Sequence, residues 1–169
     1  MGKMIETPGP ITSKDLKFMN WCIAGASIFS TCEKRNYMSI IVDQFGMVES
    51  TGYNGSPSGS EHCKDNCPRF LNQMPSGGNY DSGKGKCISL HSEVNCLFHS
   101  DVHRRQYGSM YVNGVPCYGC SKAIANSGIS RLIYLNEDGQ RTEEFAEGLH
   151  IVKAAGIAAL AMPATLTQN

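Results

Sequence analysis

The sequence predicts a single layered α/β domain in which a β-hairpin precedes an alternation of helices and strands. The chain has 169 residues, 41% of them hydrophobic, which is enough for one ordinary core. A β-rich run at 38–42 and a second at 47–53 flank a turn, which is the pattern of a hairpin. After residue 91, helical and β-rich stretches alternate. Such alternation is typical of parallel strands covered by helices.

The N-terminal half begins with residues 1–11, which contain proline and glycine and which we expect to lie across the surface as an arm. Thr12 and Asp15 have the spacing of a capping box, and apolar residues then recur at helical spacing, so a helix is expected over 13–30. The segment 55–90 follows the hairpin and is glycine-rich without periodicity. A loop of this length is expected to be functional, disordered or stapled.

The C-terminal half supplies the alternating elements. The pattern predicts a helix from His91 to about 105 and a second helix that Gly128 ends. In order, the expected elements are helix 91–105, strand 109–112, helix 117–127, strand 131–135, turn 136–139, helix 142–155 and strand 156–161.

Composition excludes several functions. The formal net charge is zero and no basic run exceeds Arg104-Arg105, which disfavours a polynucleotide partner. No apolar stretch approaches the roughly 18 residues of a membrane span, and no signal-peptide core is visible, so a cytoplasmic protein is expected. In a reducing cytosol the eight cysteines are expected to bind metal or lie in the core instead of forming disulfides.

The candidate metal-binding and acid–base residues of the chain are His91, Glu93, Cys117 and Cys120. One histidine and two cysteines can hold zinc and leave the fourth position for water. Both cysteines open a predicted helix, whose N-terminus favours thiolates, and Glu93 is suited to shuttle protons. Taken singly, these residues could be an ordinary histidine, a redox pair or a structural zinc knuckle. Pro116 before the C-x-x-C and H-x-E upstream favour a catalytic zinc, because together they form the known zinc deaminase pattern.

At these residues the chain resembles the cytidine deaminase superfamily, and within it the phage and bacterial deoxycytidylate (dCMP) deaminases. The narrower resemblance is carried by residues 50–57 (STGYNGSP), by Asn95 and by residues 126–129 (NSGI). It implies a three-layer α/β/α fold with a mixed five-stranded sheet, and hydrolytic deamination of dCMP to dUMP for thymidylate synthesis. It also implies that His91, Cys117 and Cys120 are the zinc ligands and Glu93 the proton shuttle.

The same resemblance implies substrate contacts and regulation. Asn54 matches the asparagine that binds the deoxyribose. A homohexamer activated by dCTP and inhibited by dTTP is expected, with Mg²⁺ beside the regulatory nucleotide. The regulatory site would be built around the loop of Gly52, Tyr53, Asn54 and Gly55.

The phosphate contacts depend on less specific signals. Lys34 and Arg35 are the candidates, although a solvated charge pair after a helix is an equal alternative. Ser92, which replaces the usual alanine of the motif, is grouped with the substrate-binding residues. Residues 37–39 (YMS) replace the usual Val-Gly-Ala of the base pocket, and the usual Tyr-Arg pair is missing after Tyr134. These departures leave open a nucleotide other than dCMP.

A second, structural zinc is also expected. Cys32 and Cys63 match cysteines that bind such a zinc in the relatives, and Cys67 and Cys87 would complete a closed four-cysteine site. Free thiols, or His62 in one position, are the alternatives. Elsewhere, Cys96 is expected in the core. His99 and His103 share one face of the predicted helix 91–105, where solvent or an interface is favoured over metal.

Rival functions are a deaminase of another free nucleotide or nucleoside, of a tRNA adenosine or of a riboflavin precursor, and a zinc-stabilised module without catalysis. The Gly52–Gly55 element and the neutral charge disfavour the other substrates. Glu93 disfavours the non-catalytic module, because a purely structural zinc site does not need it.

Overall fold

The computed structural model describes residues 9–75, 80, 83–136 and 143–167. Its centre is one five-stranded sheet in the order β2-β1-β3-β4-β5. The hairpin pair β1 and β2 is antiparallel, β1 and β3 are antiparallel, and β3, β4 and β5 are parallel. The strands are β1 (Met38–Val42), β2 (Val48–Tyr53), β3 (Ser109–Val112), β4 (Arg131–Asn136) and β5 (Ala158–Pro163). The expected hairpin and the expected parallel pairing are both confirmed.

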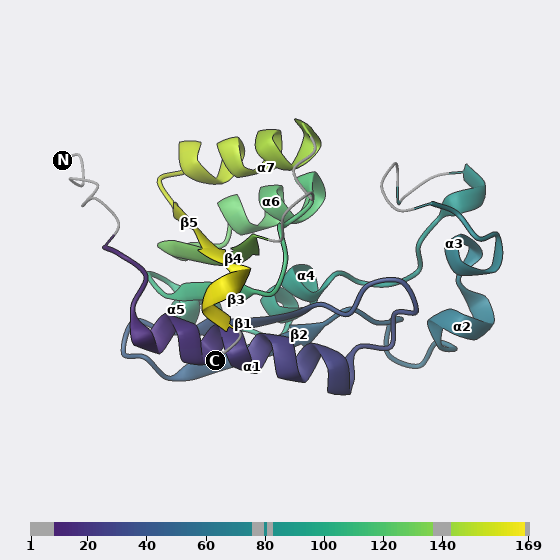
Figure 1. The fold of residues 1–169 in the computed structure, drawn as a ribbon, viewed down its shortest axis with the longest axis horizontal. Helices are drawn as coiled ribbons and strands as arrows, with labels where there is room; N and C mark the ends of the chain where they lie inside the picture. The colour runs from purple at the N-terminus through teal and green to yellow at the C-terminus, as the bar shows by residue number, and fades with distance from the viewer. Residues whose placement is uncertain (1–8, 76–79, 81–82, 137–142, 168–169) are drawn as a thin grey trace.

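One face of the sheet is covered by helix α1 (Ser13–Phe29), which lies along it in Figure 1. The capping box predicted from Thr12 and Asp15 is present, because the Asp15 backbone donates to Thr12 and the Thr12 backbone donates to Asp15. Behind this start, α1 buries a row of apolar side chains against β1, β3, β4 and β5. The fully buried members from the helix are Met19 and Cys22, with Ala26 almost so.

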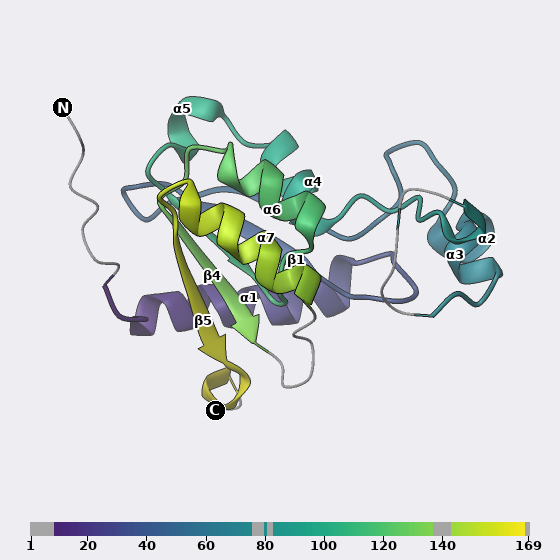
Figure 2. The ribbon, with the colours of Figure 1, turned by 90° about the horizontal axis from the view of Figure 1, so that it is seen from above.

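The opposite face is covered by α4 (Ser92–Phe98), α6 (Tyr118–Ala125) and α7 (Glu143–Ala154). Cys96, Ile124 and Val152 of these helices are fully buried against the sheet, as expected for Cys96. The fold is therefore the expected three-layer α/β/α sandwich with a mixed five-stranded sheet. Figure 2 shows α6 and α7 lying over the parallel strands β4 and β5.

A small lobe extends from one end of the sandwich (Figure 1). It belongs to the segment 55–90, which was expected to be irregular, and contains α2 (Cys63–Asn66), α3 (Pro68–Leu71) and a short 3-10 turn η1 (Gly83–Gly85). Its buried hydrophobic side chains are those of Cys63 and Cys67, which are 1% exposed and pack with Cys32 from the chain after α1. Thiols thus take the place that aliphatic side chains fill in the two main clusters.

The prediction of one helix from His91 to about 105 is wrong. Helix α4 ends at Phe98, and a separate helix, α5 (Val102–Arg105), begins after Asp101. The Asp101 carboxylate accepts hydrogen bonds from the backbones of His103 and Arg104, which makes it an N-cap and starts a new helix. His99 and His103 therefore do not share one helical face.

Other boundaries differ by a few residues. Helix α6 begins one residue after Cys117, which is its N-cap, and Gly128 follows the helix with φ +85°, a conformation that glycine adopts without strain. Most of the arm 1–11 and of the turn 136–139 lies outside the described residues. In the part of the chain that the structure describes, no helix has the length and apolarity of a membrane span.

The buried Asp15 anchors α1 to the sheet through an ion pair with the partly exposed Arg131. Its carboxylate accepts two hydrogen bonds from Arg131, at 3.1 and 3.0 Å, and one from the Tyr111 hydroxyl at 2.6 Å. Burial tends to raise the pKa of Asp15, but the hydrogen bonds from Arg131, Tyr111 and Thr12 outweigh it and lower the pKa to about 2.

We expect Asp15→Asn to lower the free energy of unfolding by about 2 kcal/mol at pH 7, because each unit of pKa shift corresponds to about 1.4 kcal/mol. The folded-state pKa lies below the unfolded one, so this stabilisation is present above pH 4 and is lost as the pH falls toward 2. Urea titrations of both proteins at several pH values measure it. A difference that is as large at pH 2.5 as at pH 7 would contradict the assignment.

Candidate active site

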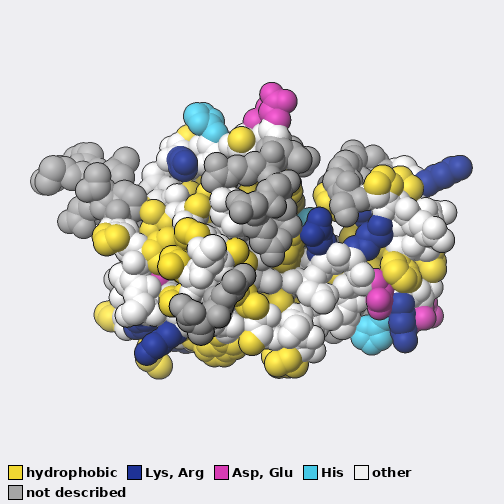
Figure 3. Space-filling model, in the orientation of Figure 1, with side chains coloured by type: hydrophobic (Ala, Val, Ile, Leu, Met, Phe, Trp, Pro, Cys, Tyr) yellow, Lys and Arg dark blue, Asp and Glu magenta, His cyan; other side chains and the backbone are white. Residues whose placement is uncertain are grey.

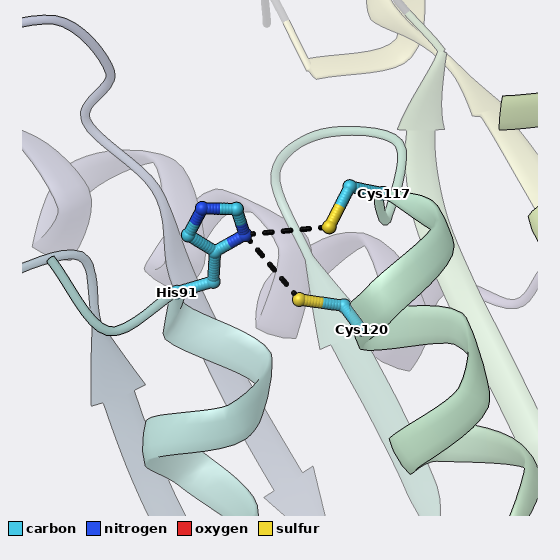
Figure 4. A group of neighbouring side chains, drawn as sticks. All are labelled: His91, Cys117 and Cys120. Atoms are coloured by element: carbon cyan, nitrogen blue, oxygen red, sulfur yellow. Dashed lines mark hydrogen bonds between the residues drawn. The ribbon is translucent and has the colours of Figure 1, made fainter. Parts of the chain in front are cut away.

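His91, Cys117 and Cys120 converge between the starts of α4 and α6 (Figure 4). The His91 Nδ1 atom lies 3.4 Å from the sulfur of Cys117 and 3.4 Å from that of Cys120. Among the described residues, these three side chains form the only group of three or more His, Cys, Asp or Glu whose ligand atoms all lie within 4.8 Å of one another.

The local fold explains why these three side chains meet. His91 is the N-cap of α4 and Cys117 the N-cap of α6, and both have extended backbone angles. Pro116 is fully buried just before α6 and fixes the chain entering that helix. Helix α6 connects the parallel strands β3 and β4, so its first turn lies at the carboxyl end of β3, where α/β folds place their functional sites.

The three ligand atoms fit zinc. In a tetrahedral site with Zn–S near 2.3 Å and Zn–N near 2.0–2.1 Å, a nitrogen and a sulfur ligand are about 3.5 Å apart, close to the two observed separations of 3.4 Å. A hydrogen bond from Cys120 lowers the pKa of Cys117 to about 4, with a further contribution from His91, so Cys117 has the thiolate character of a metal ligand. Three protein ligands leave one position open, which is the mark of a catalytic site.

Glu93 lies beside this group in the first turn of α4. Its side chain is 3% exposed, yet it borders the same cavity as His91 and Cys117. Burial raises the pKa of Glu93 above its ordinary value, which suits a carboxyl group that both takes up and releases a proton near neutral pH.

The cavity has a volume of about 230 Å³ and reaches from the candidate metal ligands to the cysteines of the lobe. Lys34, Arg35 and Arg69 supply positive charge to its lining. Figure 3 shows Lys and Arg side chains gathered where the lobe meets the sandwich. The remaining lining residues that the argument uses are Tyr37, Asn54, Tyr80 and the cysteines at positions 32, 63, 67 and 87.

The predicted substrate residues occupy different environments. Asn54 lines the cavity, but its Oδ1 accepts from the Ser92 backbone at 2.7 Å and its Nδ2 donates to the Arg35 carbonyl at 3.2 Å. Lys34 also lines the cavity, and its ammonium group donates to the Met74 carbonyl of the lobe. Ser92 is fully buried, and its hydroxyl contacts Ser39 and Glu93.

The Gly52–Gly55 element runs from edge strand β2 to the bridge with residue 90. A Cβ atom on Gly52 would lie 2.3 Å from the Cys96 backbone nitrogen, so α4 reaches its place on the sheet because this position has no side chain. The Tyr53 ring stacks on Phe29 of α1 with centroids 6.1 Å apart. Gly55 forms an isolated antiparallel bridge with Leu90, directly before His91.

Two residues that the sequence did not indicate, Tyr80 and Arg69, also contact the site. The edge of the Tyr80 ring meets the His91 imidazole with centroids 5.5 Å apart. The Arg69 guanidinium lies 4.4 Å from the centroid of the same tyrosine ring and donates to the carbonyls of Gly85 and Pro75. Both residues come from the segment without periodicity, where no motif signals a contact.

Cys32, Cys63, Cys67 and Cys87 form a second cluster. Among the described residues, no three of their sulfur atoms lie within 4.8 Å of one another, so they are more widely spaced than the ligand atoms of the first group. Cys67 receives hydrogen bonds from the backbones of Ile88, Phe70 and Arg69, and Cys63 from that of Glu33. Burial raises the pKa of Cys63 to about 11 despite its backbone donor, whereas the backbone donors of Cys67 outweigh burial and lower its pKa, which favours the thiolate there. His62 is exposed at the start of α2 and caps that helix without a side-chain hydrogen bond.

A three-layer α/β/α sandwich with a His/Cys/Cys group and a buried glutamate beside it is the arrangement typical of zinc deaminases. The sequence pattern described as the cytidine and deoxycytidylate deaminase zinc-binding region matches residues 12–136, and the chain belongs to this family of hydrolytic deaminases. The expected family and the expected fold are thereby confirmed.

Two relatives illustrate the similarity in sequence. The chain is 38% identical over 109 residues to a deoxycytidylate deaminase of Mycobacterium phage D29, covering 64% of this chain and 84% of that protein. It is 33% identical over 147 residues to the deoxycytidylate deaminase of Saccharomyces cerevisiae, covering 86% of this chain but only 43% of the yeast protein.

Solved structures agree in fold. A dCMP deaminase from the cyanophage S-TIM5, solved with dCMP and dUMP, superposes with a TM-score of 0.64 at 20% identity, covering 90% of this chain and all of the other. A Rib2 deaminase of Aspergillus oryzae superposes with a TM-score of 0.56 at 18% identity, covering 89% of this chain and 86% of the other.

Proposed function

We propose that this enzyme deaminates dCMP to dUMP by hydrolysis and so supplies thymidylate synthesis. The observation that carries the proposal is the buried Glu93 carboxylate beside the converging ligand atoms of His91, Cys117 and Cys120, at one end of a cavity with cationic side chains. The phage D29 relative, a deoxycytidylate deaminase that is aligned over 84% of its length, supports the choice of substrate.

His91, Cys117 and Cys120 would hold the zinc. When bound, zinc acidifies a water molecule and thus supplies hydrolytic chemistry near neutral pH. Glu93 would then have the proton-transfer role. Its carboxylate would take up one proton of the attacking water and deliver it to N3 of the cytosine ring. It would then take up the second proton, from the hydroxyl group formed on C4, and deliver it to the amine, so that ammonia leaves as the C4 carbonyl forms. Its position at the wall of the cavity and its raised pKa support both directions of transfer.

The nucleotide would lie with its base at the Glu93 end of the cavity and its phosphate toward the cations. Asn54 at the wall would face the deoxyribose, and Lys34 and Arg35 would attract the 5′-phosphate. Arg69 adds a third cation to the same lining. Ser92 would contribute indirectly, because its buried hydroxyl contacts Glu93 and lies away from the cavity.

A substrate panel tests the proposal. The purified enzyme is given dCMP, dCTP, CMP, cytidine and a tRNA with an adenosine target, and ammonia release is measured. We expect turnover of dCMP with kcat/KM at least about tenfold above that of each other substrate, because only dCMP combines a 5′-monophosphate with a deoxyribose. A higher kcat/KM for cytidine, dCTP or the tRNA would overturn the choice of dCMP.

Regulation, assembly and location extend the proposal. We propose activation by dCTP and inhibition by dTTP, with Mg²⁺, at the Gly52, Tyr53, Asn54 and Gly55 element, in a homohexamer. This extension rests on the family resemblance, and the exposed apolar side chains of Ile28, Phe29 and Phe98 support an assembly. The chain would act as one domain, 1–169, in the cytoplasm, which for a viral protein is that of the host.

We also propose that Cys32, Cys63, Cys67 and Cys87 hold a second, structural zinc. The clustering of the buried Cys32, Cys63 and Cys67 with the half-buried Cys87, and the backbone donors that point at Cys67, support this site. Such a zinc would tie the chain after α1 to the lobe.

We expect Cys63→Ser to lower the zinc content of the purified protein from about two to about one per chain. Serine cannot supply the thiolate that closes a four-sulfur site. Elemental analysis measures the content, with Cys22→Ser as control because Cys22 is fully buried in α1, away from the cluster. Unchanged zinc in Cys63→Ser would remove the second site from the proposal.

A further inference from the structure

Ser39 and Ser92 form a buried pair of hydroxyl groups between the sheet and the first turn of α4. Ser39 lies in the middle layer on β1, and both side chains are fully buried. Their Oγ atoms are 2.8 Å apart although the residues are 53 positions apart in the chain. The Ser92 hydroxyl also donates to Oε2 of Glu93 at 3.1 Å.

The direction of these hydrogen bonds follows from the number of protons. A serine hydroxyl carries one hydrogen and accepts through its lone pairs. The ionised Glu93 carboxylate can only accept, so in that state the hydrogen of Ser92 is directed to Glu93 and Ser39 donates to Ser92. The result is a one-way series in which Ser39 orients Ser92 and Ser92 holds one oxygen of Glu93.

The surrounding backbone keeps this series rigid. The Ser92 backbone N–H donates to Oδ1 of Asn54 at 2.7 Å, so both the main chain and the side chain of Ser92 are held. Gly52, which pairs with Ser39 across the hairpin, allows α4 to approach the strands closely enough for the two hydroxyls to meet. Breaking a buried hydrogen bond costs free energy, so these contacts favour one orientation of the Glu93 side chain.

We propose that Ser39 and Ser92 are positioning residues that hold the Glu93 carboxylate through its Oε2 atom. Neither serine contacts the cavity, so both act through the glutamate. The proposal rests on the deaminase function proposed above, and it assigns the Ser92 hydroxyl to the glutamate instead of to the nucleotide.

Kinetics of Ser39→Ala, Ser92→Ala and the double variant test the proposal. We expect Ser92→Ala to lower kcat by roughly tenfold with KM changed less than about twofold. The variant lacks a hydrogen bond to the charged Glu93, which acts in the chemical step and not in substrate binding. Ser39→Ala should lower kcat by about threefold. The double variant should match Ser92→Ala, since Ser39 acts only through Ser92, and it also leaves no hydroxyl stranded in the core should Ser92→Ala fold poorly.

The control is Ser50→Ala. Ser50 is likewise buried and donates to the backbone of α4 at Cys96, but it does not touch Glu93, so kcat should stay within about twofold. Zinc content is measured for every variant, to separate positioning from loss of metal. The proposal would be overturned if the double variant lost kcat by the product of the two single losses, or if Ser92→Ala changed KM instead of kcat.

A crystal structure of Ser92→Ala gives a readout that does not need turnover. We expect the Glu93 side chain to occupy more than one rotamer there, and a single, unmoved rotamer would overturn the proposal. If the wild-type protein deaminates no cytosine nucleotide, the proposed function fails. The rotamers of Glu93 in the Ser92→Ala crystal structure still test whether the serines hold this side chain.

Discussion

Glu93→Gln is expected to lower kcat by about 10³- to 10⁴-fold while the protein stays folded and keeps its zinc. Glutamine has nearly the shape of glutamate but cannot take up or release a proton at neutral pH. A positioned acid–base group typically raises the reaction rate by 10²–10⁴-fold, and Glu93 would carry out several proton transfers in one catalytic cycle. Since His91, Cys117 and Cys120 are unchanged, the metal ligands remain complete.

Three measurements are needed for Glu93→Gln: kcat for dCMP, zinc per chain and the midpoint of thermal unfolding. Glu147→Gln is the matched control, because Glu147 is an exposed glutamate on α7 and the same chemical change should leave kcat unaltered there. The midpoint of Glu93→Gln should equal or exceed that of the wild type, because a buried carboxylate is replaced by a neutral amide. Deamination within tenfold of wild type would exclude Glu93 as the proton shuttle.

The metal group could be predicted from the sequence because its two halves are local motifs. H-x-E and P-C-x-x-C each occupy the start of one helix, and a helix start fixes where the following side chains point. Thr12 and Asp15 predicted the start of α1 for the same reason: the capping box is completed within four residues. Short-range patterns of this kind need no knowledge of the tertiary structure.

What the sequence could not predict depends on contacts between distant segments. The sequence placed Ser92 with the substrate-binding residues and Ser39 at the base pocket, and the contact between their hydroxyls emerges only when β1 and α4 are placed together. Tyr80 and Arg69 reach the site from a segment whose path no periodicity describes. The helix expected from His91 to about 105 failed for a local reason instead: Asp101 competes as an N-cap, and the apolar pattern alone does not show this.

Cys120→Ser is expected to remove one zinc per chain and to abolish deamination to below about one thousandth of the wild-type rate. Cys120 is 2% exposed and its sulfur lies 3.4 Å from His91 Nδ1, the position of a metal ligand. A serine hydroxyl does not ionise at neutral pH and binds zinc poorly, which leaves two ligands where a catalytic site needs three. Elemental analysis and the dCMP assay measure the two effects.

The two cysteine substitutions together separate the two metals. With two sites, Cys120→Ser and Cys63→Ser should each keep about one zinc per chain, but only Cys120→Ser should lose deamination. Cys63→Ser keeps the four residues of the active site, so it should mainly lower the midpoint of thermal unfolding. The double variant should then hold no zinc. Zinc retained at the wild-type level in Cys120→Ser would exclude Cys120 as a ligand. Loss of zinc in the core control Cys22→Ser would show instead that the content follows the integrity of the fold.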